Sequence, residues 1–137
     1  MDKEQLFKKA LKKANYSTTT PRLEVFRLLS ANGPMTIGEL VKQIPNIDRA
    51  SIYRAVKLFE ELNIIKRIYT GWKYKIEIGE IFSPHHHHLI CIKCQKTIAF
   101  EEPKSIDLLI QQVAKENDFQ ETAHQFEIIG VCKDCKK

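Results

Sequence analysis

The chain has no long hydrophobic run: none of its 137 residues lies in an apolar stretch approaching the roughly 18 residues that span a membrane. The first 15 residues alternate lysine with apolar positions and lack the uncharged segment of a secretory signal. With 43% hydrophobic residues, the chain can still build the core of one ordinary domain or two small ones. We therefore expect a cytoplasmic protein that does not associate with membranes.

Cysteine and histidine are both missing from the first 84 residues. All four cysteines and all five histidines follow: Cys91, Cys94, Cys132, Cys135, His85, His86, His87, His88 and His124. The charge is uneven as well, because residues 1–80 hold 15 Lys and Arg against 9 Asp and Glu, whereas residues 81–137 hold 7 against 8. A basic half (+6) followed by a nearly neutral half (−1) indicates a polyanionic partner for the first half and a different role for the second.

The pattern of apolar residues changes period along the chain. Helical spacing and capping residues predict helices over about 3–14, 20–31, 36–44 and 48–62. β-Branched and aromatic residues on either side of Thr70-Gly71 predict a hairpin from Ile64 to Ile78. Three helices and a hairpin make a winged helix-turn-helix at residues 1–79, and residues 80–84 form a hinge. Residues 85–137 predict a small α/β domain, with a strand after residue 88, strands at Thr97–Phe100 and Phe126–Val131, and a helix at about 104–117.

The last of these N-terminal helices has the pattern of a DNA-recognition helix. Its apolar residues recur at positions i, i+3, i+4 and i+7, so one face packs on the core. The first turns and the opposite face carry hydroxyl, aromatic and cationic side chains, namely Arg49, Ser51, Tyr53, Arg54 and Lys57. Such side chains contact base edges and phosphates from the N-terminal end of a recognition helix. The alternative is an ordinary solvated basic face.

The four cysteines form two CxxC pairs separated by 37 residues. Two such pairs supply the four thiolates of a closed tetrahedral zinc site, which stabilises a fold and leaves no open position for catalysis. A thioredoxin-like redox pair is the alternative, but two matched pairs in a cytosolic chain favour zinc.

The run His85–His88 continues into the strand that leads to Cys91, and its internal position argues against a purification tag. Neighbouring side chains of a strand point to opposite sides, so His85 and His87 face one way and His86 and His88 the other. The run can therefore serve two separate sites. Imidazole suits zinc, iron, nickel, copper and manganese ions, and carboxylates shift the preference towards harder ions.

These residues together resemble the ferric uptake regulator (Fur) family of metal-responsive repressors. The resemblance covers nearly the whole chain, through the segments Thr19–Arg22, RASIYRAVKLFEELNII, HHHHLICIKC and HQFEIIGVCKDC. It implies an α+β homodimer, in which an N-terminal winged helix-turn-helix precedes a small α/β dimerisation domain with a four-cysteine zinc site. It also implies double-stranded DNA with a palindromic sequence as the partner.

The resemblance assigns residues to four roles. Arg22, Tyr53 and Arg54 match positions at the DNA. The cysteines match a structural Zn2+ site, and a second site matches His85, His87, Asp107 and His124. The regulatory site at the hinge matches His86, His88 and Glu77, with Glu80 as a competitor for Glu77 and Glu101 as a substitute carboxylate.

Two positions depart from the family pattern at the hinge site. No histidine stands near Pro34, and Ala99 occupies the place of a carboxylate. We expect a repressor of metal homeostasis genes that responds to Zn2+, Fe2+ or Mn2+, or else a DNA-binding regulator with structural zinc only and a degenerate sensing site. A zinc hydrolase is disfavoured because the chain has no HExxH motif, and a metal buffer remains the third alternative.

Overall fold

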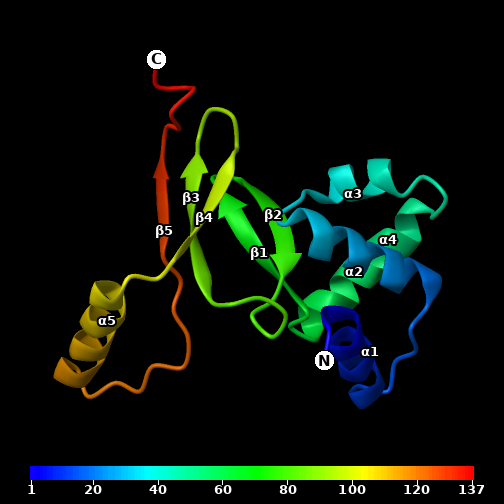
Figure 1. Cartoon of the computed structure of the whole chain (residues 1–137), viewed down its shortest axis with the longest axis horizontal. Helices are drawn as coiled ribbons and strands as arrows, with labels where there is room; N and C mark the ends of the chain where they lie inside the picture. Colours follow the sequence, from blue (N-terminus) through cyan, green and yellow to red (C-terminus); the bar gives the residue numbers. More distant parts are fainter. The chain divides into compact units, whose positions relative to one another are not determined.

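The computed structural model describes residues 1–137 as two compact units, Met1–Pro84 and His85–Lys137. The first unit contains four helices and a two-stranded sheet (Figure 1). Its elements are α1 (Lys3–Lys13), α2 (Thr20–Asn32), α3 (Ile37–Gln43), α4 (Arg49–Glu61), β1 (Ile65–Thr70) and β2 (Lys73–Ile78). This order is the predicted winged helix-turn-helix.

Each helix of the first unit begins at a side-chain cap. Asp2, Thr19, Thr36 and Asp48 accept hydrogen bonds from backbone N–H groups of the following first turn. Such caps satisfy donors that have no partner within the helix, which explains why the helices begin where the sequence predicts. The apolar faces then meet in a core built around three rings, in which Phe7 stacks on Phe26 at 4.2 Å and meets Phe59 edge-on at 5.3 Å.

The β1–β2 hairpin forms the wing and is anchored to the helical core. Ile65 pairs with Ile78 at its base and Thr70 with Lys73 at its tip. Met35 exchanges two backbone hydrogen bonds with Ile76 (2.9 and 2.7 Å), which fixes the segment before α3 against β2. The residues predicted as a hinge, 80–84, belong to this unit, where Phe82 is buried with its ring 5.0 Å from that of Phe26.

The second unit contains a three-stranded sheet and one helix. Along the chain, the helix lies between the second and the third strand of the unit. Its elements are β3 (His86–Cys91), β4 (Thr97–Glu101), α5 (Lys104–Glu116) and β5 (Glu127–Gly130). β3 lies in the middle, antiparallel to β4 and parallel to β5. The histidines that belong to a strand therefore all lie on the central strand, which is hydrogen-bonded to a neighbouring strand on both sides.

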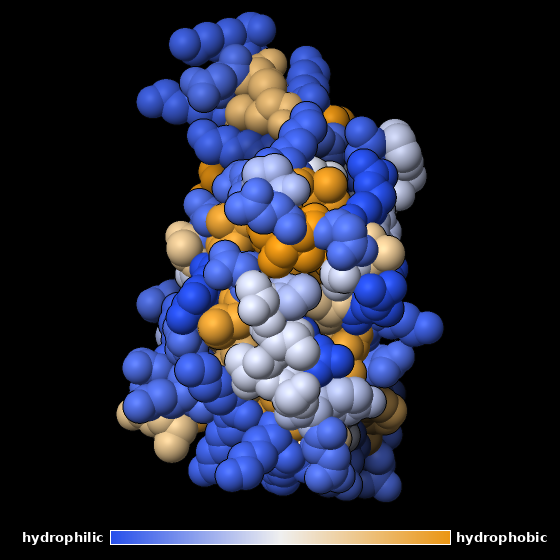
Figure 2. All heavy atoms as spheres, turned by 90° about the vertical axis from the view of Figure 1, so that its right-hand side faces the viewer, coloured by the Kyte–Doolittle hydropathy of each residue, from blue (hydrophilic) through white to orange (hydrophobic).

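The face shown in Figure 2 is mostly hydrophilic, with hydrophobic side chains gathered in patches between the polar ones. No helix is both long enough and apolar enough to cross a membrane.

Candidate metal centres and DNA-binding surface

The four cysteine sulfurs converge at the end of β3. Their Sγ atoms all lie within 4.8 Å of one another, and those of Cys94 and Cys132 are 3.6 Å apart. Zinc–sulfur bonds of about 2.3 Å at tetrahedral angles place sulfurs roughly 3.8 Å apart. The cluster therefore has the dimensions of a zinc site, and it joins β3 to the C-terminal tail.

The electrostatics of this cluster favour a bound cation. Backbone N–H groups of Cys94 and Cys132 point at the sulfur of Cys91, at 3.5 and 3.4 Å, and lower the pKa of its thiol to about 6. In contrast, the neighbouring sulfur of Cys132 raises the pKa of Cys135 to about 12. Thiolates this close repel one another, so all four ionise together only with a cation between them. The residues fit Zn2+, which would hold the tail to the sheet.

A second cluster lies on one face of β3. The side chains of His85, His87, Glu102 and His124 bring one ligand atom each to within 4.8 Å of the others. Glu102 Oε1 is 2.7 Å from Nε2 of His87 and 3.4 Å from Nε2 of His85, and it also contacts Nε2 of His124. Three imidazole nitrogens and one carboxylate oxygen make a set suited to zinc or to iron and manganese.

His124 is oriented by a further carboxylate. Its Nδ1 lies 2.8 Å from Glu121, which leaves Nε2 directed at Glu102. Burial opposes the charged imidazole, but the hydrogen bonds to Glu121 and Glu102 outweigh it and raise the pKa of His124. The hydrogen bond from His87 is the main cause that lowers the pKa of Glu102 to about 2. A carboxylate behind a ligating histidine is the usual support of such a ligand.

Glu102 stands where the sequence predicts Asp107. Asp107 lies in the first turn of α5 and accepts a hydrogen bond from Gln111 (3.1 Å), and it is absent from the cluster. The reason is the register of β3 and β4. His86 pairs with Glu101, so one step further along the ladder Glu102 falls opposite His85 and on the same side. In the sequence, the signal for this ligand is that Glu102 directly follows Glu101, so the two carboxylates point to opposite sides, as the histidines do.

The opposite face of β3 carries His86 and His88, whose rings lie 4.8 Å apart. The ladder places Glu101 beside His86 and the methyl group of Ala99 beside His88 on this face. Within the first unit, Lys66 pairs with both candidate hinge carboxylates, Glu77 at 3.5 Å and Glu80 at 3.9 Å. The Glu77 side chain is only 5% exposed and that of Glu80 is 55% exposed.

The predicted DNA-contacting side chains of α4 share one exposed surface. Ile52, Val56 and Phe59 are buried, whereas Arg49, Tyr53, Arg54 and Lys57 are exposed. Asp48 accepts hydrogen bonds from the backbone N–H and the hydroxyl of Ser51, and that hydroxyl accepts one from Arg54 (3.0 Å). This chain of bonds holds the Arg54 guanidinium over the N-terminal turns of α4, where a recognition helix contacts bases.

Other basic residues are held by protein partners. Arg22 donates to the Ser17 carbonyl (2.8 Å), and its guanidinium lies over the Tyr16 ring. Arg67 makes two hydrogen bonds to Glu60 (2.9 and 3.1 Å), which raise the pKa of Arg67. The arginine of the wing is thus bound to the helix, which fixes the wing relative to α4.

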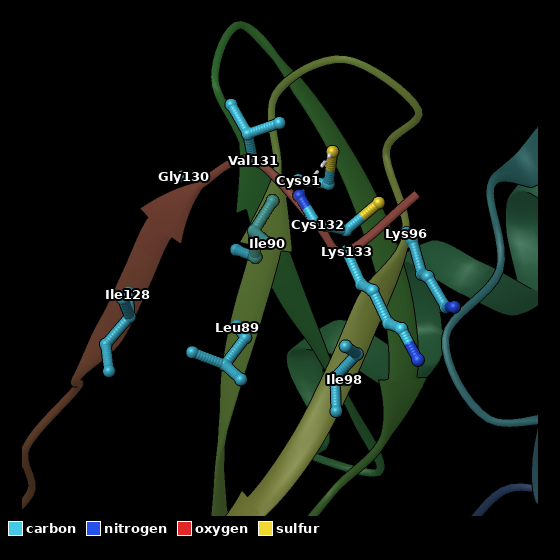
Figure 3. A pocket seen from close by; sticks show the side chains of 10 residues that line it. All are labelled: Leu89, Ile90, Cys91, Lys96, Ile98, Ile128, Gly130, Val131, Cys132 and Lys133. Carbon is cyan, nitrogen blue, oxygen red and sulfur yellow. Dashed lines mark hydrogen bonds between the residues drawn. The ribbon is translucent and has the colours of Figure 1, made fainter. Parts of the chain in front are cut away.

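An apolar surface lies beside the cysteine cluster. Ile98, Leu89 and Ile128 occupy one row across β4, β3 and β5 and project from the same side of the sheet, as Figure 3 shows. Ile98 and Ile128 are 43% and 46% exposed. Separately from this row, helix α5 exposes Leu108, Leu109 and Val113, and none of its residues is buried. Apolar area of this extent on a small unit marks an interaction surface.

Substitution of Cys132 by serine tests the closed four-cysteine site. We expect Cys132→Ser to lose one tightly held zinc per chain and to lower the melting temperature, because metal binding and folding are coupled at such sites. Lys133→Ser, at the neighbouring exposed position, is the control and is expected to keep both. Elemental analysis and thermal unfolding measure the two effects, and a Cys132→Ser protein with unchanged zinc and melting temperature contradicts the assignment.

Paired carboxylate variants test the second cluster. We expect Glu102→Gln to weaken metal binding at this site by at least about tenfold, because it removes an ionised ligand. Asp107→Asn is expected to change the affinity by less than about twofold, since its carboxylate lies outside the cluster. Competition with a chromophoric chelator gives both affinities. A larger loss of metal affinity in Asp107→Asn than in Glu102→Gln would identify Asp107 as the ligand, as the sequence predicts.

Comparisons with known proteins agree with this geometry. Residues 13–129 match the ferric uptake regulator family. The chain is 33% identical over 135 residues to the peroxide-responsive repressor PerR of Staphylococcus epidermidis, with 93% of this chain and 87% of the relative covered. It is 30% identical over 135 residues to the ferric uptake regulation protein of Neisseria meningitidis, with 92% and 90% covered.

Solved structures give the same result. The Helicobacter pylori ferric uptake regulator, described as having three functional metal binding sites, superposes with a TM-score of 0.83 at 26% identity, covering 97% of this chain and 91% of that one. The Vibrio cholerae regulator gives a TM-score of 0.79 at 28% identity, covering 92% and 99%. A family match across most of the chain, relatives of nearly the same length and a shared fold establish the relationship. The chain belongs to the ferric uptake regulator family.

Proposed function

We propose that this protein is a dimeric DNA-binding repressor of metal homeostasis genes whose affinity for its operator is set by a divalent metal ion. The observation that carries the proposal is the set of donors on β3 and the residue before it. His85 and His87 form one pair, His86 and His88 form another on the opposite face, and Cys91 ends the strand. The winged helix that precedes this strand supplies the DNA-binding part. The family is one of transcription regulators, in agreement with the expectation that the chain is not an enzyme.

The metal sites have different roles in this proposal. Zn2+ at the four cysteines is structural, because a closed tetrahedral site offers no exchangeable position. A second Zn2+, Fe2+ or Mn2+ binds His85, His87, Glu102 and His124 and fixes the segment between α5 and β5. The regulatory ion binds His86 and His88, with Glu101 as a further carboxylate on that face.

Regulation requires a ligand from the first unit, and Glu77 is the proposed one. Its position on β2 is fixed by pairing with Lys66 on β1, and its carboxylate is almost buried beside that ammonium group. An ion shared between Glu77 and the two histidines links the wing to the second unit. The connection between the two units, which passes from Pro84 to His85, then changes conformation with metal occupancy, and so does the geometry of the two DNA-binding units in the dimer.

The exposed apolar surface of the second unit supports a homodimer. β5 is an edge strand on which Ile128 is exposed, Ile98 is exposed on β4, and Leu108, Leu109 and Val113 are exposed on α5. A two-fold dimer buries this surface and presents two recognition helices to a palindromic operator. We place the protein in the cytoplasm, where its DNA is accessible.

One observation favours a second candidate function. The residue opposite His88 is Ala99, which offers no ligand, and no histidine stands near Pro34. A site with fewer ligands binds its ion more weakly, and the protein would then be a DNA-binding regulator with structural zinc only. Its DNA affinity would not depend on a second metal.

Substitution of Arg54 by alanine tests DNA recognition. The probe is a DNA duplex that the metal-loaded protein selects from a random pool. We expect Arg54→Ala to weaken binding to this duplex by about 1–3 kcal/mol, which is the contribution of a good bidentate arginine–guanine contact. Arg27→Ala is the control, because Arg27 is bound to Glu4 on α1 and lies outside the recognition surface. Fluorescence anisotropy gives the affinities, with metal content measured in parallel. The proposed function is contradicted if the selection yields no palindromic duplex. It is also contradicted if Arg54→Ala and Arg27→Ala lose the same amount of DNA affinity.

A further inference from the structure

The tip of the wing holds the only tryptophan of the chain in an almost fully exposed position. Trp72 is 88% exposed and follows Gly71, whose positive φ of 83° makes the tight turn between β1 and β2. The ammonium group of Lys73 lies 4.7 Å from the centre of the indole ring. The fold gains little from an indole in water, so its contribution is to be sought in an interaction outside the chain.

A groove lies between α4 and the wing, with Tyr53, Arg54 and Lys57 on the α4 side and Arg67 and Tyr74 on the wing side. Glu60 and Glu61 of α4 line it as well, and Glu60 pairs with Arg67, so Arg54 and Lys57 are the cations of this groove that no acidic side chain of it is shown to pair with. Cross-strand pairing then leads outward along the hairpin to its tip, where Thr70 pairs with Lys73.

Aromatic and cationic side chains alternate along this path. Tyr69 is 53% exposed with its ring 6.0 Å from that of Tyr74, and the Arg67 guanidinium lies 4.3 Å from the Tyr74 ring. Residues 65–78 hold four basic side chains and one acidic side chain, a net charge of +3. The charge favours a polyanion as the partner of the wing, and the rings favour one that offers apolar surface next to its charges. The minor groove of a nucleic acid duplex, where sugars lie beside phosphates, has both.

We propose that Trp72 and Lys73 form a second DNA contact in each protomer, beside the half-site that α4 occupies. The indole packs into the minor groove against sugars and base edges, where apolar side chains act as wedges, and the Lys73 ammonium neutralises a flanking phosphate. The two residues then have separable roles, because apolar packing of the indole releases no counterions, whereas a phosphate contact does and is therefore weakened by salt. This inference rests on the proposed DNA-binding function.

The sole tryptophan reports directly on its own environment. We expect the metal-loaded protein to show quenched and blue-shifted indole emission when titrated with the selected duplex, with a midpoint equal to that obtained by anisotropy. Emission that stays unchanged while anisotropy shows binding overturns the inference and leaves the proposed function intact. An emission shift produced by vesicles of anionic phospholipid but not by the duplex overturns it in favour of a membrane contact.

Three variants separate the wing contact from folding and from the function itself. Trp72→Ala is expected to weaken DNA binding about tenfold with an unchanged salt slope, and Trp72→Phe to keep most of the affinity. Lys73→Ala is expected to reduce the slope of log K against log salt by about 0.9, one phosphate contact. Zinc content and circular dichroism are expected to match the unmodified protein, because both side chains are exposed.

If Trp72→Ala binds the duplex within about twofold of the unmodified affinity while Arg54→Ala binds it much more weakly, the wing contact is contradicted and the proposed function is not. Failure of the unmodified protein to prefer any selected duplex over random DNA contradicts the proposed function instead.

Discussion

The alternation of side chains along β3 is the constraint on which the metal chemistry of this protein depends. Four consecutive histidines in an extended strand cannot serve one ion, because neighbours point to opposite faces. His85 and His87 therefore meet Glu102 and His124, whereas His86 and His88 face the other way. Cys91 ends the same strand, so one rigid element in the middle of the sheet carries ligands for every proposed ion. A shift of this strand by one residue would exchange the two histidine pairs.

Each proposed ion ties β3 to a different part of the chain. The cysteine site connects it to the C-terminal tail, and the His85–His87 site connects it to the segment before β5 through His124. The proposed regulatory ion connects it to the wing through Glu77. The wing is in turn bound to α4 by Arg67 and Glu60. In this proposal, a path of strong polar contacts leads from the regulatory site to the recognition helix.

Much of this arrangement is predictable from the sequence, and the carboxylate of the second cluster shows the limit. Helix limits follow from local caps such as Thr36 and Asp48, and the zinc site follows from the spacing of the CxxC pairs. The carboxylate of the second site depends on the register of β3 against β4, which is a tertiary property. Asp107 has a suitable side chain, but it lies in the first turn of α5, which begins after Pro103, and it accepts a hydrogen bond from Gln111 instead. The packing of Phe82 on Phe26 is likewise set by the three-dimensional core.

The most direct test of metal-dependent DNA binding compares DNA affinity before and after the histidine sites are filled, starting from protein that retains zinc only at its cysteines. Allosteric coupling of a typical 1–3 kcal/mol predicts that added Zn2+, Fe2+ or Mn2+ tightens binding to the selected duplex about 5- to 150-fold. His88→Ala is expected to abolish this gain and to keep the structural zinc. Equal DNA affinity with and without the added metal would contradict metal sensing and identify a regulator with structural zinc only.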